Sequence, residues 1–346
     1  MYLRALATAT PARSFTQAES LALVRSSPGA LARLDRRSRL MLQTILRGDS
    51  GIEARQFALH DPATLFQLDA DGLNEEFRAA APALASEALG KALHEAELAA
   101  DELDVLIVTT CTGYLCPGVS SYVAENLGLR SDAWLQDIVG LGCGAAIPSL
   151  RSASSILSSD PGLTAACISV EICSAAFYLD SDPGVVVSAC LFGDGAAATI
   201  WQGGKINGGI RCHGFASLHQ PEHRDLIRFE QREGKLRNLL HPSVPRLAAD
   251  AVGTLYREAA RQSPVSRVLS HAGGRDVIEA IEKELPGVQL DETREVLRHH
   301  GNMSSPSVIF ALERALRSGG PEPGADWWLV SFGAGFSAHS CRLSGD

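Results

Sequence analysis

Apolar and polar positions follow two periods along the chain, one typical of helices and the other of buried strands. Residues 83–98 place apolar side chains at the spacing of a helix, and the apolar run over 104–113 ends in turn residues, as a strand does. The same alternation predicts a first strand at the N-terminus. It also predicts helices over 119–129 and after residue 143, and strands over 133–142, 163–173 and 196–204. Helices and strands that alternate in this way are typical of an α/β fold.

The composition changes after residue 203, where a polar stretch with many His and Arg residues over 213–238 predicts a hairpin or a flap. Beyond it we expect helices over 246–262, from Arg275 and from Pro306, and strands over 265–274 and 327–336. The architecture is therefore expected to be α/β in two similar halves, residues 1–204 and 205–346. Polar residues interrupt every apolar run before it reaches the roughly 20 residues that span a membrane, which predicts a soluble, cytoplasmic chain.

Charge and cysteine content narrow the classes of function. The formal net charge is −9, from 31 Lys and Arg against 40 Asp and Glu, and an acidic average surface does not attract nucleic acid or an anionic membrane. The eight cysteines are scattered, with no Cys-x-x-Cys pair and no Cys/His cluster at zinc spacing. Free thiols are therefore expected, and a metal site is not.

One cysteine, Cys143, stands between two glycines in "VGLGCGAA", after an expected strand and before an expected helix. A thiol at the start of a helix gains thiolate character from the unpaired N–H groups and the helix dipole. The glycines allow a sharp turn and leave room for an acyl group at the sulfur. Cys143 is therefore a candidate nucleophile, and the alternative is a small buried apolar residue.

Two further polar residues stand at corners between elements. His271 ends the apolar run "VLSH" before two glycines, where α/β folds present functional groups. Asn302 in "GNMSSPSV" precedes a helix for which Ser305 is the expected N-cap and Pro306 the first residue. Taken singly, His271 fits a hydrogen-bonded core histidine and Asn302 fits a left-handed turn.

Five stretches together carry a resemblance that covers the whole chain: "VGLGCGAA", "LFGDGAAA", "SHAGG", "GNMSS" and "SFGAGF". The sequence resembles the type III polyketide synthases of the chalcone and stilbene synthase superfamily, which implies a layered αβαβα thiolase fold. The resemblance implies that Cys143 accepts the acyl group and that His271 and Asn302 complete the catalytic set. It also implies a homodimer that uses an acyl-CoA starter and malonyl-CoA, with no metal or redox cofactor.

The resemblance also suggests which residues surround the substrate. Phe192 matches a gatekeeper phenylalanine, whereas the segment 233–245 offers no second one and Phe229 lies upstream, so we expect a differently shaped entrance. Arg55 is the candidate for binding the phosphates of CoA, and Cys116 matches the residue that reaches into the neighbouring subunit's cavity. The substrate-binding candidates are Phe192, Cys173, Cys111, Thr112, Cys116, Ala176, Gly333, Gly335 and Phe336.

The activity that this resemblance implies is iterated decarboxylative Claisen condensation. The segment "VEICSAAF" places Cys173 and Ala176 where plant members generally carry threonines, so it resembles bacterial members and favours a fatty acyl starter with an alkylpyrone or alkylresorcinol product. One alternative is an initiating β-ketoacyl carrier-protein synthase, which condenses once. Another is a non-catalytic partner subunit of a different synthase.

Overall fold

The computed structural model describes residues 1–61, 64 and 66–345, and its largest element is a nine-stranded mixed sheet. The strand order is β11-β12-β13-β8-β1-β7-β6-β4-β5. Between β1 and β8 only two residue pairs form, Tyr2 with Arg211 and Leu3 with Ile210, so two groups of strands meet along a short seam. The strands of this sheet are β1 (Tyr2–Ala9), β4 (Val105–Thr109), β5 (Trp134–Ile138), β6 (Thr164–Glu171), β7 (Gly195–Gln202), β8 (Ile210–His219), β11 (Val265–Ser270), β12 (Asp326–Gly333) and β13 (Ser337–Gly345).

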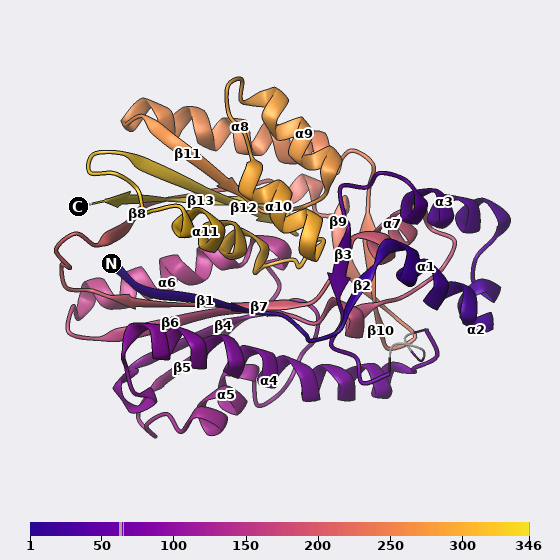
Figure 1. The fold of residues 1–346 in the computed structure, drawn as a ribbon, viewed down its shortest axis with the longest axis horizontal. Helices are drawn as coiled ribbons and strands as arrows, with labels where there is room; N and C mark the ends of the chain where they lie inside the picture. Colours follow the sequence, from indigo (N-terminus) through magenta and orange to yellow (C-terminus); the bar gives the residue numbers. More distant parts are fainter. Residues whose placement is uncertain (62–63, 65, 346) are drawn as a thin grey trace.

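Helices cover both faces of each group of strands and give five layers, as Figure 1 shows. Helices α4 (Ala70–Ala96) and α5 (Val119–Leu127) cover the outer face of the β1 to β5 group, and α8 (Val244–Gln262) and α9 (Arg275–Glu284) cover that of the β8 to β13 group. Helices α6 (Ala146–Ser159) and α11 (Ser307–Arg317) lie between the two groups and contact strands of both. The expected αβαβα layering is confirmed.

The burial of each strand explains its sequence pattern. Strand β6 has other strands on both sides and is buried over its whole length, which is why residues 164–171 read as a nearly continuous apolar run. Strand β5 is the edge of the sheet, and the side chains of Trp134 and Leu135 are exposed there. Among the described helices, none is long and apolar enough to span a membrane.

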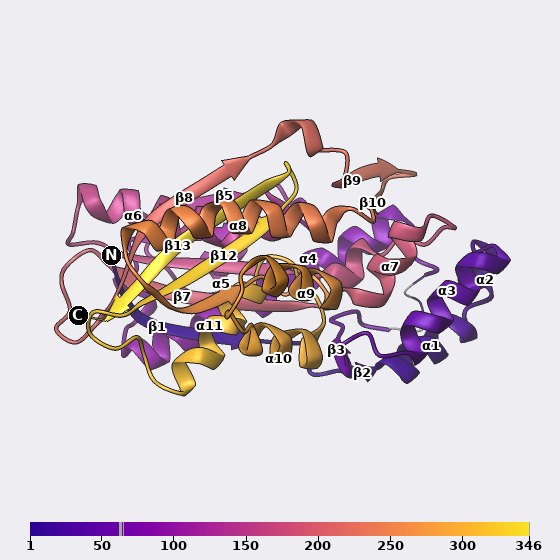
Figure 2. The same ribbon diagram turned by 90° about the horizontal axis from the view of Figure 1, so that it is seen from above.

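A smaller assembly lies at the end of the molecule opposite the two termini (Figure 2). Its helices are α1 (Gln17–Ser26), α2 (Pro28–Ala32), α3 (Arg36–Arg47) and α7 (Pro183–Leu191), and its strands form the pairs β2 (Ser14–Thr16) with β3 (Ala54–Gln56) and β9 (Ile227–Arg232) with β10 (Lys235–Leu240). Leu21 of α1 and Leu42 of α3 belong to the same buried apolar cluster as Cys143 and Phe192. This assembly therefore covers the nucleophile.

Most of the expected elements are present, with two informative differences. The polar stretch 213–238 was expected to be a hairpin or flap, but its first part continues β8 in the main sheet and only 227–240 forms a hairpin. Strand β13 and helices α1 to α3 and α10 (Asp291–His300) were not predicted. The boundary expected near residue 205 falls between β7 and β8, and the similarity of the two halves stays a prediction.

Candidate active site

The turn that carries Cys143 joins β5 to α6. Gly142 has a φ of +56°, a left-handed conformation that favours glycine. A Cβ on Gly142 would lie 3.1 Å from the main-chain nitrogen of Ala334, and one on Gly333 would lie 2.8 Å from that of Cys143. The glycines therefore allow the turn, as expected. The main chain of residues 332–334 packs against these glycines, while Gly142 also lines the cavity at Cys143, so room for an acyl group at the sulfur stays a prediction.

Ser304 lies at the centre of the site and contacts all three predicted catalytic residues. Its hydroxyl donates to Sγ of Cys143 at 3.2 Å, and its main-chain N–H donates to Oδ1 of Asn302 at 2.8 Å. Its main chain also lies close enough to the imidazole of His271 to raise the pKa of that ring. On its other side, Oγ of Ser304 lies 3.2 Å from Sγ of Cys111. The structure thus brings together residues from three distant segments around one serine.

The carboxamide of Asn302 is held in a fixed orientation. Nδ2 donates to the carbonyl oxygen of Gly273 at 3.2 Å, while Oδ1 accepts the hydrogen bond from Ser304. An amide nitrogen carries two hydrogens, so one remains for an oxygen of the substrate. The main chain of Asn302 also binds both neighbours of Phe192: its N–H donates to the carbonyl of Leu191 at 2.9 Å, and its carbonyl accepts from Gly193 at 3.0 Å.

His271 follows β11 and is 2% exposed. Its ring packs edge to face against Phe332, with the centroids 5.2 Å apart. Nδ1 of this ring has no hydrogen-bond partner among the described residues. A buried polar atom without a partner is costly, so a group of the substrate that bonds to Nδ1 would remove that cost.

Burial sets the protonation of the nucleophile and the base. It raises the pKa of the Cys143 thiol to about 12 and lowers the pKa of His271 to about 3, and Ser304 opposes each shift. The helix end therefore does not by itself ionise the sulfur, as the sequence suggested it would. A neutral imidazole can accept a proton, so the direction of this shift is compatible with the catalytic role expected for His271.

A buried carboxylate, Glu171, joins the segment of Cys111 and Thr112 to the turn that carries Ser305. Oε2 accepts hydrogen bonds from the main-chain nitrogens of Cys111 at 3.0 Å and Thr112 at 3.1 Å, and Oε1 accepts one from the hydroxyl of Ser305 at 2.6 Å. Burial raises the pKa of Glu171, and these donors oppose that rise. The N-cap role expected for Ser305 is wrong, because its hydroxyl binds Glu171 and α11 begins at Ser307.

Two small cavities lie near Cys143, and Cys143 itself lines one of them. One of about 30 Å³ is lined by Cys143, Ser304 and Phe192, among others. A second, of about 20 Å³, is also lined by Phe192 and continues along Cys173 and Ala176. Of the predicted residues, Phe192 therefore lines the same cavity as Cys143, and Cys173 and Ala176 line the second cavity on the other side of Phe192.

A larger cavity, of about 500 Å³, begins at Cys111 and Thr112. Leu73 and Phe77 of α4 and Leu236 of β10 supply much of its apolar lining. Its volume lies in the range of small-molecule binding pockets. Cys111 and Thr112 also line the smaller cavity beside Cys143, so these two residues connect the two spaces.

Phe229 is the aromatic residue that lines all three cavities. It pairs across the β9–β10 hairpin with Asn238, which also lines both small cavities. Side chains of cross-strand partners lie on the same face of a sheet. Phe229 therefore supplies the second aromatic side chain, which segment 233–245 lacks, from the neighbouring strand.

The structure contradicts two of the predicted contacts and leaves others as predictions. Arg55 is 1% exposed and donates to the carbonyls of Ala189 and Phe192, so its expected role at a surface mouth for CoA phosphates is wrong. Phe336 is fully buried and stacks on Phe332, so its expected substrate contact is also wrong. Gly335 lines none of the three cavities, but its neighbour Ala334 lines two of them, so a substrate contact by Gly335 stays a prediction. Cys116 is exposed, and its contact with a neighbouring subunit also stays a prediction.

The sequence interpretation did not identify Ser304, Glu171 and Phe229 as functional residues. Ser304 and Glu171 lie within the quoted stretches "GNMSS" and "VEIC", so their closeness to predicted site residues was the available signal. Phe229 gave a weaker signal, as the aromatic residue of a hairpin that is rich in charged side chains. No group of three or more His, Cys, Asp or Glu side chains that could hold a metal ion is found within the described residues.

Comparison with known protein families agrees with this site. Residues 22–206 match the family model for FAE1/Type III polyketide synthase-like protein, and residues 255–344 match that for the C-terminal part of 3-oxoacyl-[acyl-carrier-protein] synthase III. A 3,5-dihydroxyphenylacetyl-CoA synthase from Streptomyces toyocaensis is 31% identical over 83% of this chain and 78% of its own length. A 1,3,6,8-tetrahydroxynaphthalene synthase from Streptomyces peucetius subsp. caesius is 29% identical over 98% of this chain and 92% of its own length.

Solved structures show the same fold. PKS-I from the brown alga Ectocarpus siliculosus superposes with a TM-score of 0.89 at 25% identity, over all of this chain and 98% of the other. The 1,3,6,8-tetrahydroxynaphthalene synthase of Streptomyces coelicolor A3(2) superposes with a TM-score of 0.88 over all of this chain and 99% of the other, at 24% identity, which bears on the fold alone. The matched family model spans more than half of the chain. The chain therefore belongs to the type III polyketide synthases, which are acyltransferases that condense acyl-CoA substrates.

Proposed function

We propose that this polyketide synthase loads a fatty acyl group from CoA on Cys143 and extends it with malonyl-CoA by repeated decarboxylative condensation. The observation that carries the proposal is the convergence of Cys143, His271 and Asn302 on Ser304, next to a space of about 500 Å³ that shares Cys111 and Thr112 with the cavity at Cys143. A nucleophile, a base and a neutral hydrogen-bond donor are the groups that this reaction requires.

In the loading step His271 takes the proton of the Cys143 thiol as the sulfur attacks the thioester carbonyl of the starter. The new C–S bond to Cys143 replaces the C–S bond to CoA. The CoA thiolate leaves, and the proton from Cys143 stays on His271. The hydroxyl of Ser304 stabilises negative charge on the Cys143 sulfur through the hydrogen bond at 3.2 Å.

In the extension step the bond between malonyl C2 and its carboxylate breaks and CO2 leaves. The electron pair moves toward the thioester oxygen, where the free Nδ2 hydrogen of Asn302 and the imidazole of His271 stabilise the enolate. Carbon C2 then attacks the acyl group on Cys143, a C–C bond forms and the sulfur is released. This sequence uses protein side chains alone, so we propose that no metal or redox cofactor takes part.

The choice of starter rests on the lining of the large cavity. Leu73, Phe77 and Leu236 offer apolar surface, and burying the methylene groups of an acyl chain against it is favourable by about 0.8 kcal/mol each. We therefore propose a fatty acyl starter and an alkylpyrone or alkylresorcinol product. The segment with Cys173 and Ala176 adds a second apolar wall beside Phe192.

The names of the relatives suggest a second candidate for the product. Two of them are named for hydroxylated aromatic products, 3,5-dihydroxyphenylacetyl-CoA and 1,3,6,8-tetrahydroxynaphthalene, and a phloroglucinol synthase of Pseudomonas fluorescens is 24% identical over 74% of this chain. The product would then be a hydroxylated ring without an alkyl tail. The match of residues 255–344 to a carrier-protein-dependent synthase model adds malonyl carrier protein as an extender to be tested.

We also propose a cytoplasmic homodimer. Trp134 and Leu135 of the edge strand β5 and the neighbouring Val139 are 58%, 37% and 52% exposed. An open strand edge with apolar side chains is favourable for pairing with a second copy of the chain. Cys116 is exposed as well, which leaves it free to reach a partner subunit.

The starter prediction is tested by incubating the purified protein with labelled malonyl-CoA and acetyl-, hexanoyl-, lauroyl- or palmitoyl-CoA. We expect the long-chain starters to give tri- or tetraketide products that keep the alkyl tail, identified by mass spectrometry, and Cys143→Ala to give none. Products from malonyl-CoA alone would favour the second candidate. No condensation product from any starter or extender would overturn the polyketide synthase proposal.

The role of His271 predicts how fast Cys143 reacts with iodoacetamide. Because burial raises the pKa of the thiol to about 12, the sulfur needs a neighbouring base at neutral pH. We expect His271→Gln to slow alkylation at pH 7 by about a hundredfold, the size of a general-base contribution, and to make the rate rise with pH throughout the alkaline range. An alkylation rate equal to that of the unmodified protein at pH 7 would show that His271 is not the base.

The role of Asn302 predicts a separation of the two steps. Asn302→Ala removes a donor to the enolate but none to the loading reaction, so acylation of Cys143 is expected to persist. Decarboxylation of malonyl-CoA should fall by about a hundredfold, the usual effect of losing one such donor. Intact-protein mass and release of labelled CO2 measure the two steps. Full decarboxylation by Asn302→Ala would refute the assignment.

The dimer is tested by light scattering after size-exclusion chromatography. We expect a molar mass of twice the 36.7 kDa of one chain. The mass should shift toward that of one chain when Trp134→Glu places a charge on the exposed strand edge. Leu40→Glu is the matched control, because Leu40 is also exposed, at 66%, but lies on α3. A single-chain mass for the unmodified protein at micromolar concentration would contradict the proposal.

A further inference from the structure

The β9–β10 hairpin sets one boundary of the acyl site although it stands outside the main sheet. Phe229 and Asn238 lie opposite each other on it and line the cavities beside Cys143. An isolated two-stranded hairpin is only marginally stable in water, so contacts with the rest of the protein must hold it. The position of the hairpin therefore determines the width of the acyl site.

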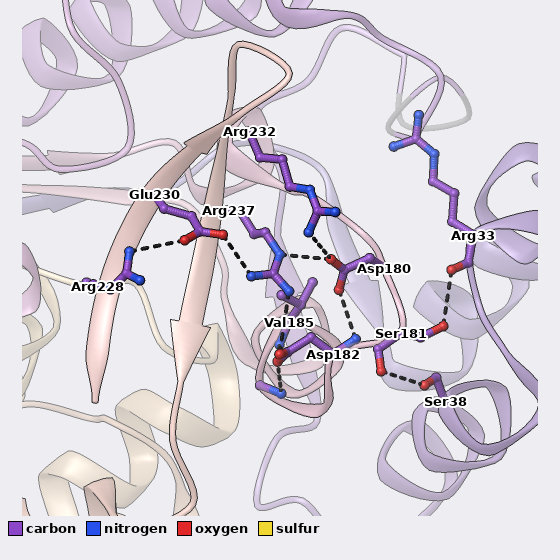
Figure 3. Close-up of polar contacts among 11 residues, drawn as sticks. Arg33, Ser38, Asp180, Ser181, Asp182, Val185, Arg228, Glu230, Arg232 and Arg237 are labelled. Carbon is purple, nitrogen blue, oxygen red and sulfur yellow. Dashed lines mark hydrogen bonds and ion pairs between the residues drawn. The ribbon is translucent and has the colours of Figure 1, made fainter. Parts of the chain in front are cut away.

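The opposite face of the hairpin carries an ion cluster centred on Arg237, which Figure 3 shows. The side chain of Arg237 is 10% exposed. Its guanidinium lies 2.8 Å from a carboxylate oxygen of Asp180, 2.9 Å from one of Glu230 and 3.5 Å from one of Asp182. We call these four residues the Arg237 clamp. A guanidinium suits this place because its planar set of donors can bind several carboxylates at once.

The carboxylates of the clamp belong to two different elements. Glu230 is the cross-strand partner of Arg237 on the hairpin itself. Asp182 is the N-cap of α7, where it accepts hydrogen bonds from the main-chain nitrogens of Gly184 and Val185 at 2.8 and 3.3 Å. The clamp therefore joins the hairpin to the start of α7. The close approach is visible in the main chain too, since a Cβ on Gly184 would lie 2.4 Å from the carbonyl oxygen of Leu240.

The same loop also anchors the helices that cover the nucleophile. Ser181, between the two aspartates, accepts a hydrogen bond from the main-chain nitrogen of Asp35 and, through its carbonyl, one from the hydroxyl of Ser38. Its own hydroxyl donates to the carbonyl of Arg33. Residues 180–182 are thus a junction between the hairpin, α7 and the α2–α3 region.

The other end of α7 lies at the catalytic residues. The helix has nine residues, which corresponds to about 13 Å, and Phe192 follows its last turn. The main chain on either side of Phe192 bonds to Asn302, and Arg55 donates to the Phe192 carbonyl at 2.8 Å. Because a short helix moves as a rigid body, the clamp at its start fixes the direction in which Phe192 is presented.

We propose that Arg237 is a positioning residue that sets the gap between Phe192 and Phe229, and through it the length of acyl chain that the site accepts. The inference rests on the proposed function, because it concerns the acyl site of that reaction. Arg237 contacts no substrate itself. It acts by holding two elements together, one with Phe192 at its end and the other with Phe229.

The experiment measures starter selectivity in variants of the clamp. Arg237→Gln removes the cation that the three carboxylates share, leaving Glu230 with Arg228 and Asp180 with the exposed Arg232. Arg237→Lys keeps the charge and loses the planar set of donors. Arg232→Gln is the matched control, because Arg232 lies on the same hairpin but is 54% exposed and 3.7 Å from Asp180. For each protein, kcat/KM for acylation of Cys143 by hexanoyl-CoA and by palmitoyl-CoA is compared with the rate of malonyl-CoA decarboxylation.

We expect Arg237→Gln to change the ratio of the palmitoyl to the hexanoyl kcat/KM by about tenfold or more, as a misplacement of roughly an ångström does. Malonyl-CoA decarboxylation should stay near that of the unmodified protein, because Asn302 and His271 keep their own hydrogen bonds. Arg237→Lys should restore part of the ratio, and Arg232→Gln should leave it unchanged.

An unchanged ratio in a folded Arg237→Gln protein would overturn the proposal, and so would an equal loss of both acylation rates and decarboxylation. If Arg237→Gln does not fold, Arg237→Lys and Asp180→Asn carry the test by the same ratio. Failure of all three to fold would also overturn it, since the clamp would then support the whole structure. Absence of acylation in the unmodified protein is a separate result, which contradicts the proposed function instead.

Discussion

The hydrogen bonds around Ser304 are the constraint on which the site depends. Cys143, the proposed nucleophile, precedes α6, His271, the proposed base, follows β11, and Asn302 lies in the turn before α11, so no two of these segments are neighbours in sequence. Ser304 touches all three, through its hydroxyl and its main chain, and has a φ of +59°, which L-residues rarely adopt. That conformation is maintained because the turn is pinned on both sides, by Glu171 through Ser305 and by the pairing of Asn302 with the chain at Phe192.

Burial gives this arrangement its chemical character. Burial raises the pKa of the Cys143 thiol and lowers that of the His271 imidazole, so both groups favour their neutral forms. Fixed donors then act at full strength, because no water competes for the oxygen on which the charge appears. The helices at the end of the molecule, together with α7 and the β9–β10 hairpin, are what exclude the water. Their polar contacts with one another are therefore as important to the chemistry as the residues that carry it out.

Much of the fold could be predicted from the chain, because the apolar periods report directly which faces are buried. The buried run of β6 and the regular helix α8 are examples. The candidate catalytic residues could also be named, because each stands at a corner between elements and within a stretch that carries the family resemblance. What could not be read from the sequence was the packing. The main chain of 332–334 fills the space beside Gly142, Arg55 turns inward to main-chain carbonyls, and Phe229 reaches the cavity through its pairing with Asn238. Each depends on a contact between residues far apart in the chain.

The proposed reaction depends on Cys143 as the acyl acceptor, although Cys111 lies across Ser304 from it and Cys173 lines the neighbouring cavity. The most direct test is to quench the protein after brief exposure to a labelled acyl-CoA, digest it, and locate the thioester by peptide mass. We expect the label on the peptide that contains Cys143. A label on the peptide of Cys111 or Cys173, with Cys143 unmodified, would contradict the proposed reaction.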